Sequence, residues 1–143
     1  MFHQLDDRVY ASPQISLTDI SVAAQAGIGM VINNRPEGES DDQTPGAEIE
    51  AAARAAGMDY VAIPVTHAGF SESQVKAMAA ALAASERPVL AYCRSGTRST
   101  LLWALAEASH GKSPHALAAA AAGAGYDVTP VRALMDMLAA REG

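Results

Sequence analysis

Short apolar stretches alternate with helix-forming stretches along this chain of 143 residues. Four of these stretches are predicted strands, because they are apolar and are bounded by turn residues. They span residues 8–11, 30–32, 60–65 and 89–92. Helices are predicted at residues 17–26, 47–56, 71–85 and 99–109, and two more begin at Ser113-Pro114 and Thr129-Pro130. The alternation predicts an α/β fold with a mainly parallel central sheet of about four strands and helices on both faces.

The composition limits the classes of function. Half of the residues are hydrophobic and 18 % are charged, which is typical of a globular protein, and the length predicts a single domain over residues 1–143. The net charge of −6 argues against binding to nucleic acid or to an anionic membrane surface. The longest apolar runs are too short to span a membrane, and residues 1–8 do not resemble a signal peptide. We therefore expect a cytoplasmic protein.

Cys93 is the only cysteine, which excludes an internal disulfide and a metal site built from several cysteines. His110 and His115 have no partners at metal-ligand spacing. Neither a metal nor another cofactor is predicted.

The segment from Cys93 to Ser99 carries the strongest chemical signal. It joins an apolar strand to the start of a helix, where backbone N–H groups that point into a loop bind an anion. The same field stabilises a thiolate at Cys93 and makes it a nucleophile. Arg98 can hold an oxyanion with two N–H groups at once. The rest of the predicted anion-binding loop consists of Arg94, Ser95, Gly96 and Thr97.

The alternative interpretation of Cys93 is a buried cysteine that ends a core strand. The polar residues that follow disfavour it, since they do not suit a core. Arg94 is expected to point out of the loop and to add positive potential.

The polar stretch over residues 33–42 follows the end of a predicted strand, where ligands bind in folds of this class. Asn34 and Arg35 are therefore candidates for guiding an anionic substrate. The alternative is that these residues only shape the loop and that an Arg–Glu pair fixes it. The acidic side chains here are interpreted as a solvated rim, and they are Glu37, Glu39, Asp41 and Asp42. Packing roles are expected for Trp103, Met135 and Met137.

The spacing Cys-x4-Arg resembles the active loop of rhodanese sulfurtransferases, and the loop also resembles that of protein tyrosine and dual-specificity phosphatases. Over about residues 8–110 the chain resembles a narrower family, the phosphatase-like domain of beta-lactamase hydrolase-like proteins. The motifs that carry this resemblance are Gln14-Ile15, Val31-Ile-Asn-Asn-Arg-Pro-Glu-Gly-Glu39, Ala55-Ala-Gly57, Ile63-Pro-Val65 and Tyr92-Cys-Arg-Ser-Gly-Thr-Arg-Ser99.

This resemblance implies a dual-specificity-phosphatase-like fold. It makes Cys93 the nucleophile, Arg98 the anion-holding residue and Ser99 the hydroxyl that supports the thiolate. In the family the domain occurs alone or fused to a persulfide dioxygenase, which implies a functional link to such an enzyme. Two features depart from the phosphatase pattern: the loop is one residue shorter, and residues 64–69 contain no Asp to act as the general acid. His67 is the candidate for that role, and the alternative is a loop histidine that caps or hydrogen-bonds a neighbour.

Three functions stay open at this point. The first is a cysteine-dependent phosphatase-like hydrolase acting on a small phosphate ester. The second is a rhodanese-type sulfurtransferase that takes sulfur from a sulfane-sulfur donor and carries a persulfide on Cys93. The third is a non-catalytic anion-binding or redox-sensing module. A homo-oligomer is a further expectation, since the Ala-rich helices near the C-terminus can pack against a second copy.

Overall fold

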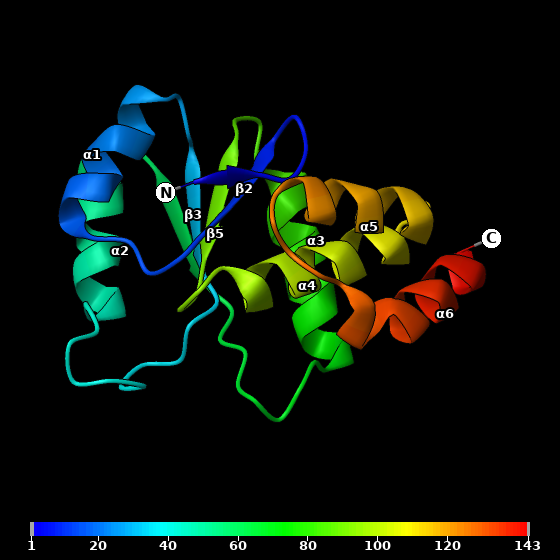
Figure 1. Cartoon of the computed structure of the whole chain (residues 1–143). Coiled ribbons are helices and arrows are strands. Elements are labelled where there is room, and N and C mark those ends of the chain that lie inside the picture. The colour runs from blue at the N-terminus through cyan, green and yellow to red at the C-terminus, as the bar shows by residue number, and fades with distance from the viewer. Residues whose placement is uncertain (1, 143) are drawn as a thin grey trace.

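The computed structural model describes residues 2–142, which form one five-stranded sheet with helices on both faces (Figure 1). The strand order is β1-β2-β5-β3-β4. The strands are β1 (His3–Gln4), β2 (Val9–Ser12), β3 (Met30–Asn33), β4 (Asp59–Ala62) and β5 (Val89–Tyr92). All neighbours pair in parallel except β1 and β2, which are antiparallel. The predicted class and the mainly parallel sheet are confirmed.

The sheet has one strand more than predicted, and the bounds of β2, β3 and β4 differ from the predicted ranges. Strand β1 was not expected, because two residues are too few to show a strand pattern. Strand β4 ends at Ala62 rather than at Val65, because Pro64 has no N–H with which to continue the ladder. The chain still follows β3 beyond that point, since Ile63 and Val65 donate 2.9 Å hydrogen bonds to the carbonyls of Asn33 and Asn34.

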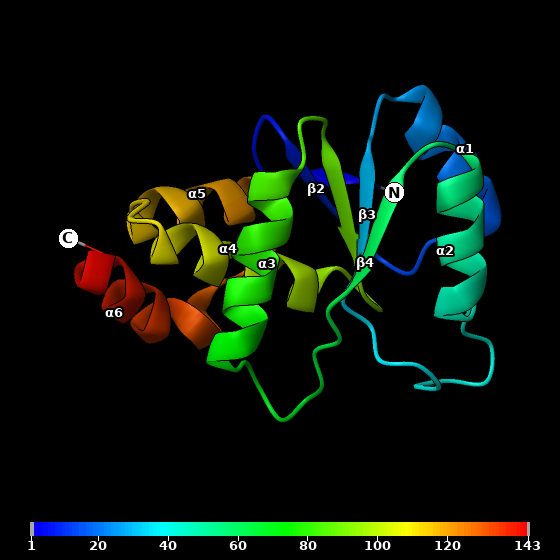
Figure 2. The ribbon, with the colours of Figure 1, turned by 180° about the vertical axis from the view of Figure 1, so that it is seen from behind.

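Two helices cover one face of the sheet and the other four lie on the opposite face (Figure 2). On the first face are α1 (Leu17–Gln25) and α2 (Gly46–Ala55). On the second are α3 (Glu72–Ala84) and α4 (Thr97–Ser109), with α5 (Pro114–Gly123) and α6 (Arg132–Glu142) packed against α4. Each face has its own buried apolar cluster.

Helix starts follow local capping chemistry. Ser71 and Gln74 form the predicted capping box of α3, in which each side chain bonds the other residue's backbone N–H. Helix α4 begins at Thr97 rather than Ser99, directly after Gly96, whose φ of +94° an L side chain rarely adopts. The predicted start at Thr129 opens only a 3₁₀ turn (Thr129–Val131), and α6 begins after it.

The packing roles are confirmed for two of three side chains. Trp103 and Met135 are fully buried, and the Trp103 indole N–H donates to Asp6. Met137 is 51 % exposed, so its predicted packing role is wrong. Met135, two residues earlier on α6, belongs instead to the core cluster that contains the buried residues of α4.

The register of the central strands brings distant loops together. Ser12, Asn33 and Tyr92 are paired across β2, β5 and β3 at the ends of these strands. The residues that follow each strand therefore meet at one edge of the sheet. Among residues 2–142, none of the helices combines the length and the apolar character needed to cross a membrane.

Candidate active site

Cys93 stands at the centre of this edge, immediately after β5. Its backbone N–H donates to the Ser12 carbonyl (3.3 Å), which continues the pairing with β2. Its Sγ accepts a hydrogen bond from the backbone N–H of Gly96 at 3.1 Å. The side chain has no exposed surface. The loop thus aims a peptide N–H at the sulfur, as a helix start is expected to do for an anion.

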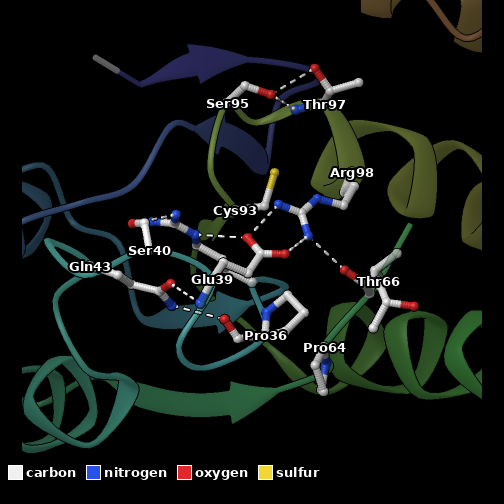
Figure 3. Close-up of polar contacts among 12 residues, drawn as sticks. Pro36, Glu39, Ser40, Gln43, Pro64, Thr66, Cys93, Ser95, Thr97 and Arg98 are labelled. Atoms are coloured by element: carbon white, nitrogen blue, oxygen red, sulfur yellow. Dashed lines mark hydrogen bonds and ion pairs between the residues drawn. The ribbon is translucent and has the colours of Figure 1, made fainter. Parts of the chain in front are cut away.

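Arg98 lies in the first turn of α4, next to Cys93 (Figure 3). Its Nη1 donates to Glu39 and to the Val65 carbonyl, both at 2.7 Å, and its Nη2 donates to Glu39 at 2.9 Å. The hydrogen bonds to Glu39 raise the pKa of Arg98, and the charge of the nearby Cys93 adds to this. Three of the five N–H groups of the guanidinium are used. The remaining two, on Nε and Nη2, share one edge of the planar group, and this fork can hold an oxyanion.

Glu39 forms an Arg–Glu pair, which was one of the two interpretations drawn from the sequence, whereas the solvated-rim interpretation is wrong. It belongs to no solvated rim: its carboxylate binds Arg98 and also Arg35 (2.9 Å), and the side chain is only 17 % exposed. The hydrogen bonds from Arg98 and then from Arg35 lower its pKa from 4.5 to about 2. Glu39 is therefore a fixed anion at neutral pH and has no proton to give. The pair with Arg35 was predicted as an alternative, whereas the contact of Glu39 with Arg98 was not predicted.

Arg35 and Asn34 brace the loops. Arg35 is 4 % exposed, and besides Glu39 it donates to Gln14 (3.0 Å) and Ser40 (3.1 Å). Asn34 is fully buried and donates to the Ile63 carbonyl at 2.9 Å. These contacts favour the loop-shaping interpretation of both residues. Gln14 was not singled out as a site residue, although its backbone N–H also binds the Arg94 carbonyl at 3.1 Å.

Ser99 is fully buried in α4, and its hydroxyl donates to the Asn34 side-chain oxygen at 2.7 Å. A hydroxyl has a single proton, and Asn34 accepts this one. Support of the thiolate by Ser99, which the resemblance implies, requires the proton to turn toward Cys93.

Two other residues of the anion-binding loop lie on its solvent-exposed side. Arg94 and Ser95 are exposed, as predicted for Arg94, and the Ser95 hydroxyl donates to the Thr97 hydroxyl at 3.0 Å. His67 is exposed on the connection between β4 and α3, two residues after the Val65 carbonyl that Arg98 binds. Within residues 2–142 no group of three or more His, Cys, Asp or Glu side chains is placed to hold a metal ion.

The chain is similar in sequence to known proteins over about three quarters of its length. A family model described as "Beta-lactamase hydrolase-like protein, phosphatase-like domain" matches residues 2–110. A beta-lactamase hydrolase-like protein of Agrobacterium fabrum is 35 % identical over 109 residues, which are 76 % of this chain and 25 % of that protein. The chain thus spans about a quarter of the length of the curated relatives it matches.

Several solved structures have a similar fold over nearly the whole length of this chain. A Neisseria meningitidis protein assigned as a phosphatase is 34 % identical, with a TM-score of 0.83 and coverage of 95 % of this chain and 96 % of that one. A Shewanella putrefaciens protein with the same assignment is 26 % identical, with a TM-score of 0.79 and coverage of 99 % and 90 %. Kinase associated phosphatase, at 17 % identity and a TM-score of 0.73, shares the fold; 97 % of this chain and 94 % of that one are covered. The fold is that of the tyrosine and dual-specificity phosphatases.

Proposed function

Because this chain belongs to the phosphatase-like domain family of beta-lactamase hydrolase-like proteins, we propose that it is a cysteine-dependent phosphatase. Its nucleophile is the Cys93 thiolate, and its substrate is a small phosphate ester. The observation that carries the proposal is the contact of the Gly96 N–H with the Cys93 sulfur, beside the guanidinium of Arg98. A loop amide and a guanidinium edge at one sulfur supply donors for the phosphoryl oxygens around it.

The reaction proceeds in two displacements. The Cys93 sulfur attacks phosphorus, a P–S bond forms, and the P–O bond to the leaving group breaks with its electron pair on oxygen. The loop amides and Arg98 hold the equatorial oxygens as charge develops. Water then attacks phosphorus, the P–S bond breaks, and phosphate leaves as the thiolate is restored.

The protonation of the leaving group sets the substrate class. Glu39 is the carboxylate that contacts Arg98, and a pKa of about 2 leaves it ionised. The leaving oxygen therefore departs as a stable anion or takes its proton from water or from His67. We accordingly place aryl phosphates ahead of alkyl phosphates as substrates.

Access to the sulfur is part of the same proposal. Cys93 has no exposed surface, so a neighbouring side chain has to move for a phosphoryl group to reach Sγ. The exposed Arg94 and Ser95 lie next to it in the loop. Neither of these side chains takes part in the Glu39–Arg98 ion pair.

The test is release of para-nitrophenol from para-nitrophenyl phosphate by three proteins: wild type, Cys93→Ser and Arg98→Lys. Cys93→Ser is expected to be inactive. Arg98→Lys keeps the charge but loses the planar fork, and is expected to lose about 10²-fold in kcat/KM. Full activity in Cys93→Ser would refute the proposal.

A second candidate is sulfur transfer, which the four residues between Cys93 and Arg98 favour, because a six-residue ring suits a persulfide sulfur or a small oxyanion. In it, Cys93 takes a sulfane sulfur from thiosulfate, releases sulfite, and passes the sulfur to a thiol. Intact mass after brief exposure to thiosulfate separates the two, since only this candidate adds one sulfur atom to Cys93. The redox-sensing module, the persulfide dioxygenase link, the cytoplasmic location and the second copy stay predictions from the sequence.

A further inference from the structure

Tyr126 reaches the anion-binding loop from a part of the chain that the family model does not match. It lies between α5 and the 3₁₀ turn, whereas the match ends at residue 110. Its hydroxyl donates to the carbonyl oxygen of Ser95 at 3.1 Å. Its ring packs edge-on against His3, with the ring centres 5.6 Å apart. Both ends of the side chain are thus held.

The Ser95 carbonyl and the Gly96 N–H belong to one peptide group. No cis peptide bond occurs in the part of the chain that the structure describes, so these two groups point in opposite directions. The N–H side donates to the Cys93 sulfur (3.1 Å), and the C=O side accepts from Tyr126. One peptide plane is therefore fixed between the nucleophile and the tyrosine.

The Ser95–Gly96 peptide can rotate unless a contact holds it, because it is followed by a glycine. The φ of +94° at Gly96 is a conformation that glycine adopts freely, and a glycine backbone also permits the peptide before it to rotate. Rotation would turn the Ser95 carbonyl oxygen toward the sulfur and toward any bound oxyanion. A partial negative charge would then replace a hydrogen-bond donor at that point.

The Tyr126 side chain also packs closely against Gly96. A side chain at position 96 would collide with the Tyr126 hydroxyl. Burial, and then the charge of Cys93, raise the pKa of Tyr126, so its hydroxyl keeps the proton that it donates.

We propose that Tyr126 is a positioning residue, which holds the Ser95–Gly96 peptide with its N–H toward the Cys93 sulfur and its incoming oxyanion. The inference rests on the proposed function only in taking Cys93 as the nucleophile. It adds a residue from beyond the matched region to the machinery of the site.

The test compares Tyr126→Phe with wild type and with Tyr10→Phe. Phenylalanine at 126 keeps the ring against His3 and removes only the hydroxyl. Tyr10 lies in β2 and packs in the cluster on the α1–α2 face, so it is a matched control for loss of a tyrosine hydroxyl. The readouts are the rate of Cys93 alkylation by iodoacetamide across pH, and its protection by inorganic phosphate.

Tyr126→Phe is expected to move the pH midpoint of alkylation upward by about one unit, because a charge-assisted hydrogen bond to the thiolate is weakened. The phosphate concentration for half-protection is expected to rise about tenfold, while Tyr10→Phe matches wild type. An unchanged midpoint and unchanged protection in Tyr126→Phe would overturn the inference. Failure of the proposed function is distinct: wild type would then release no para-nitrophenol, whereas the alkylation comparison would still decide the role of Tyr126.

Discussion

Replacing Glu39 by Gln tests the charge arrangement that the structure places at the site. The carboxylate joins Arg98 on α4 to Arg35 in the loop after β3, and both cations are largely buried. Glutamine has nearly the same shape, but its NH₂ group turns two donors toward guanidinium groups that also only donate. The variant therefore removes one charge and leaves two buried cations without a carboxylate partner, although Arg35 keeps Gln14 and Ser40, and Arg98 keeps the Val65 carbonyl.

The magnitude follows from the lowered pKa. Glu39 has a pKa of about 2 in the folded protein against 4.5 as its ordinary value. At 1.36 kcal/mol for each pKa unit, the ionised carboxylate contributes about 3 kcal/mol to the free energy of unfolding at pH 7. This is an upper value, because the side chain is 17 % exposed and water screens part of the interaction.

The pH dependence has a definite sign. A depressed carboxyl pKa stabilises the folded state above pH 4.5, and that stability is lost as the pH falls toward 2. The difference between wild type and Glu39→Gln is therefore expected to shrink from about 3 kcal/mol at pH 7 to about 1.4 kcal/mol at pH 3. Glutamine mimics the protonated acid, so the two proteins converge at low pH.

Urea unfolding of both proteins at pH 7, 4 and 3 measures this difference. Glu50→Gln is the matched control, because Glu50 pairs with Arg54 on the exposed side of α2, where an ion pair is worth about 0.5 kcal/mol or less. A loss below about 1 kcal/mol for Glu39→Gln at pH 7, or one that does not change with pH, would refute the assigned charge arrangement.

Three further predictions concern other residues. Ser99→Ala leaves the buried Asn34 oxygen without its donor and is expected to cost about 1–3 kcal/mol in urea unfolding; a cost near zero would contradict the hydrogen bond. Met135→Ala is expected to lower stability by about 2–5 kcal/mol, whereas Met137→Ala stays within about 0.5 kcal/mol, and equal costs would contradict their different burial. If His67 protonates leaving groups, His67→Asn slows hydrolysis of an alkyl phosphate more than that of para-nitrophenyl phosphate; an equal effect on kcat/KM would exclude that role.

The sequence predicted those parts of the fold and site that depend on local pattern. The bounds of β5 are as predicted, because a run of four apolar residues lies between Pro88 and a polar loop. The position of Cys93 at a helix start follows from Gly96 and the polar residues around it. The capping box of α3 could be predicted because it is also a local pattern, in which Ser71 and Gln74 are three residues apart.

Contacts between distant residues could not be predicted in this way. Glu39 resembles its acidic neighbours in the sequence, and its partner Arg98 is 59 residues away. Tyr126 binds the loop from 31 residues beyond Ser95, in a segment with no motif of its own. The direction of the Ser99 hydroxyl depends on Asn34, which only the pairing of β3 beside β5 brings near. In each case the partner is set by the folded sheet and not by spacing along the chain.

The most direct test of Cys93 as a phosphatase nucleophile is the intact mass of the protein, acid-quenched within its first turnovers of para-nitrophenyl phosphate. A gain of one phosphoryl group is expected in wild type and none in Cys93→Ser, with the added mass on the peptide that contains Cys93. Turnover by wild type with no phosphoryl adduct at any quench time, together with an active Cys93→Ser, would contradict this role of Cys93.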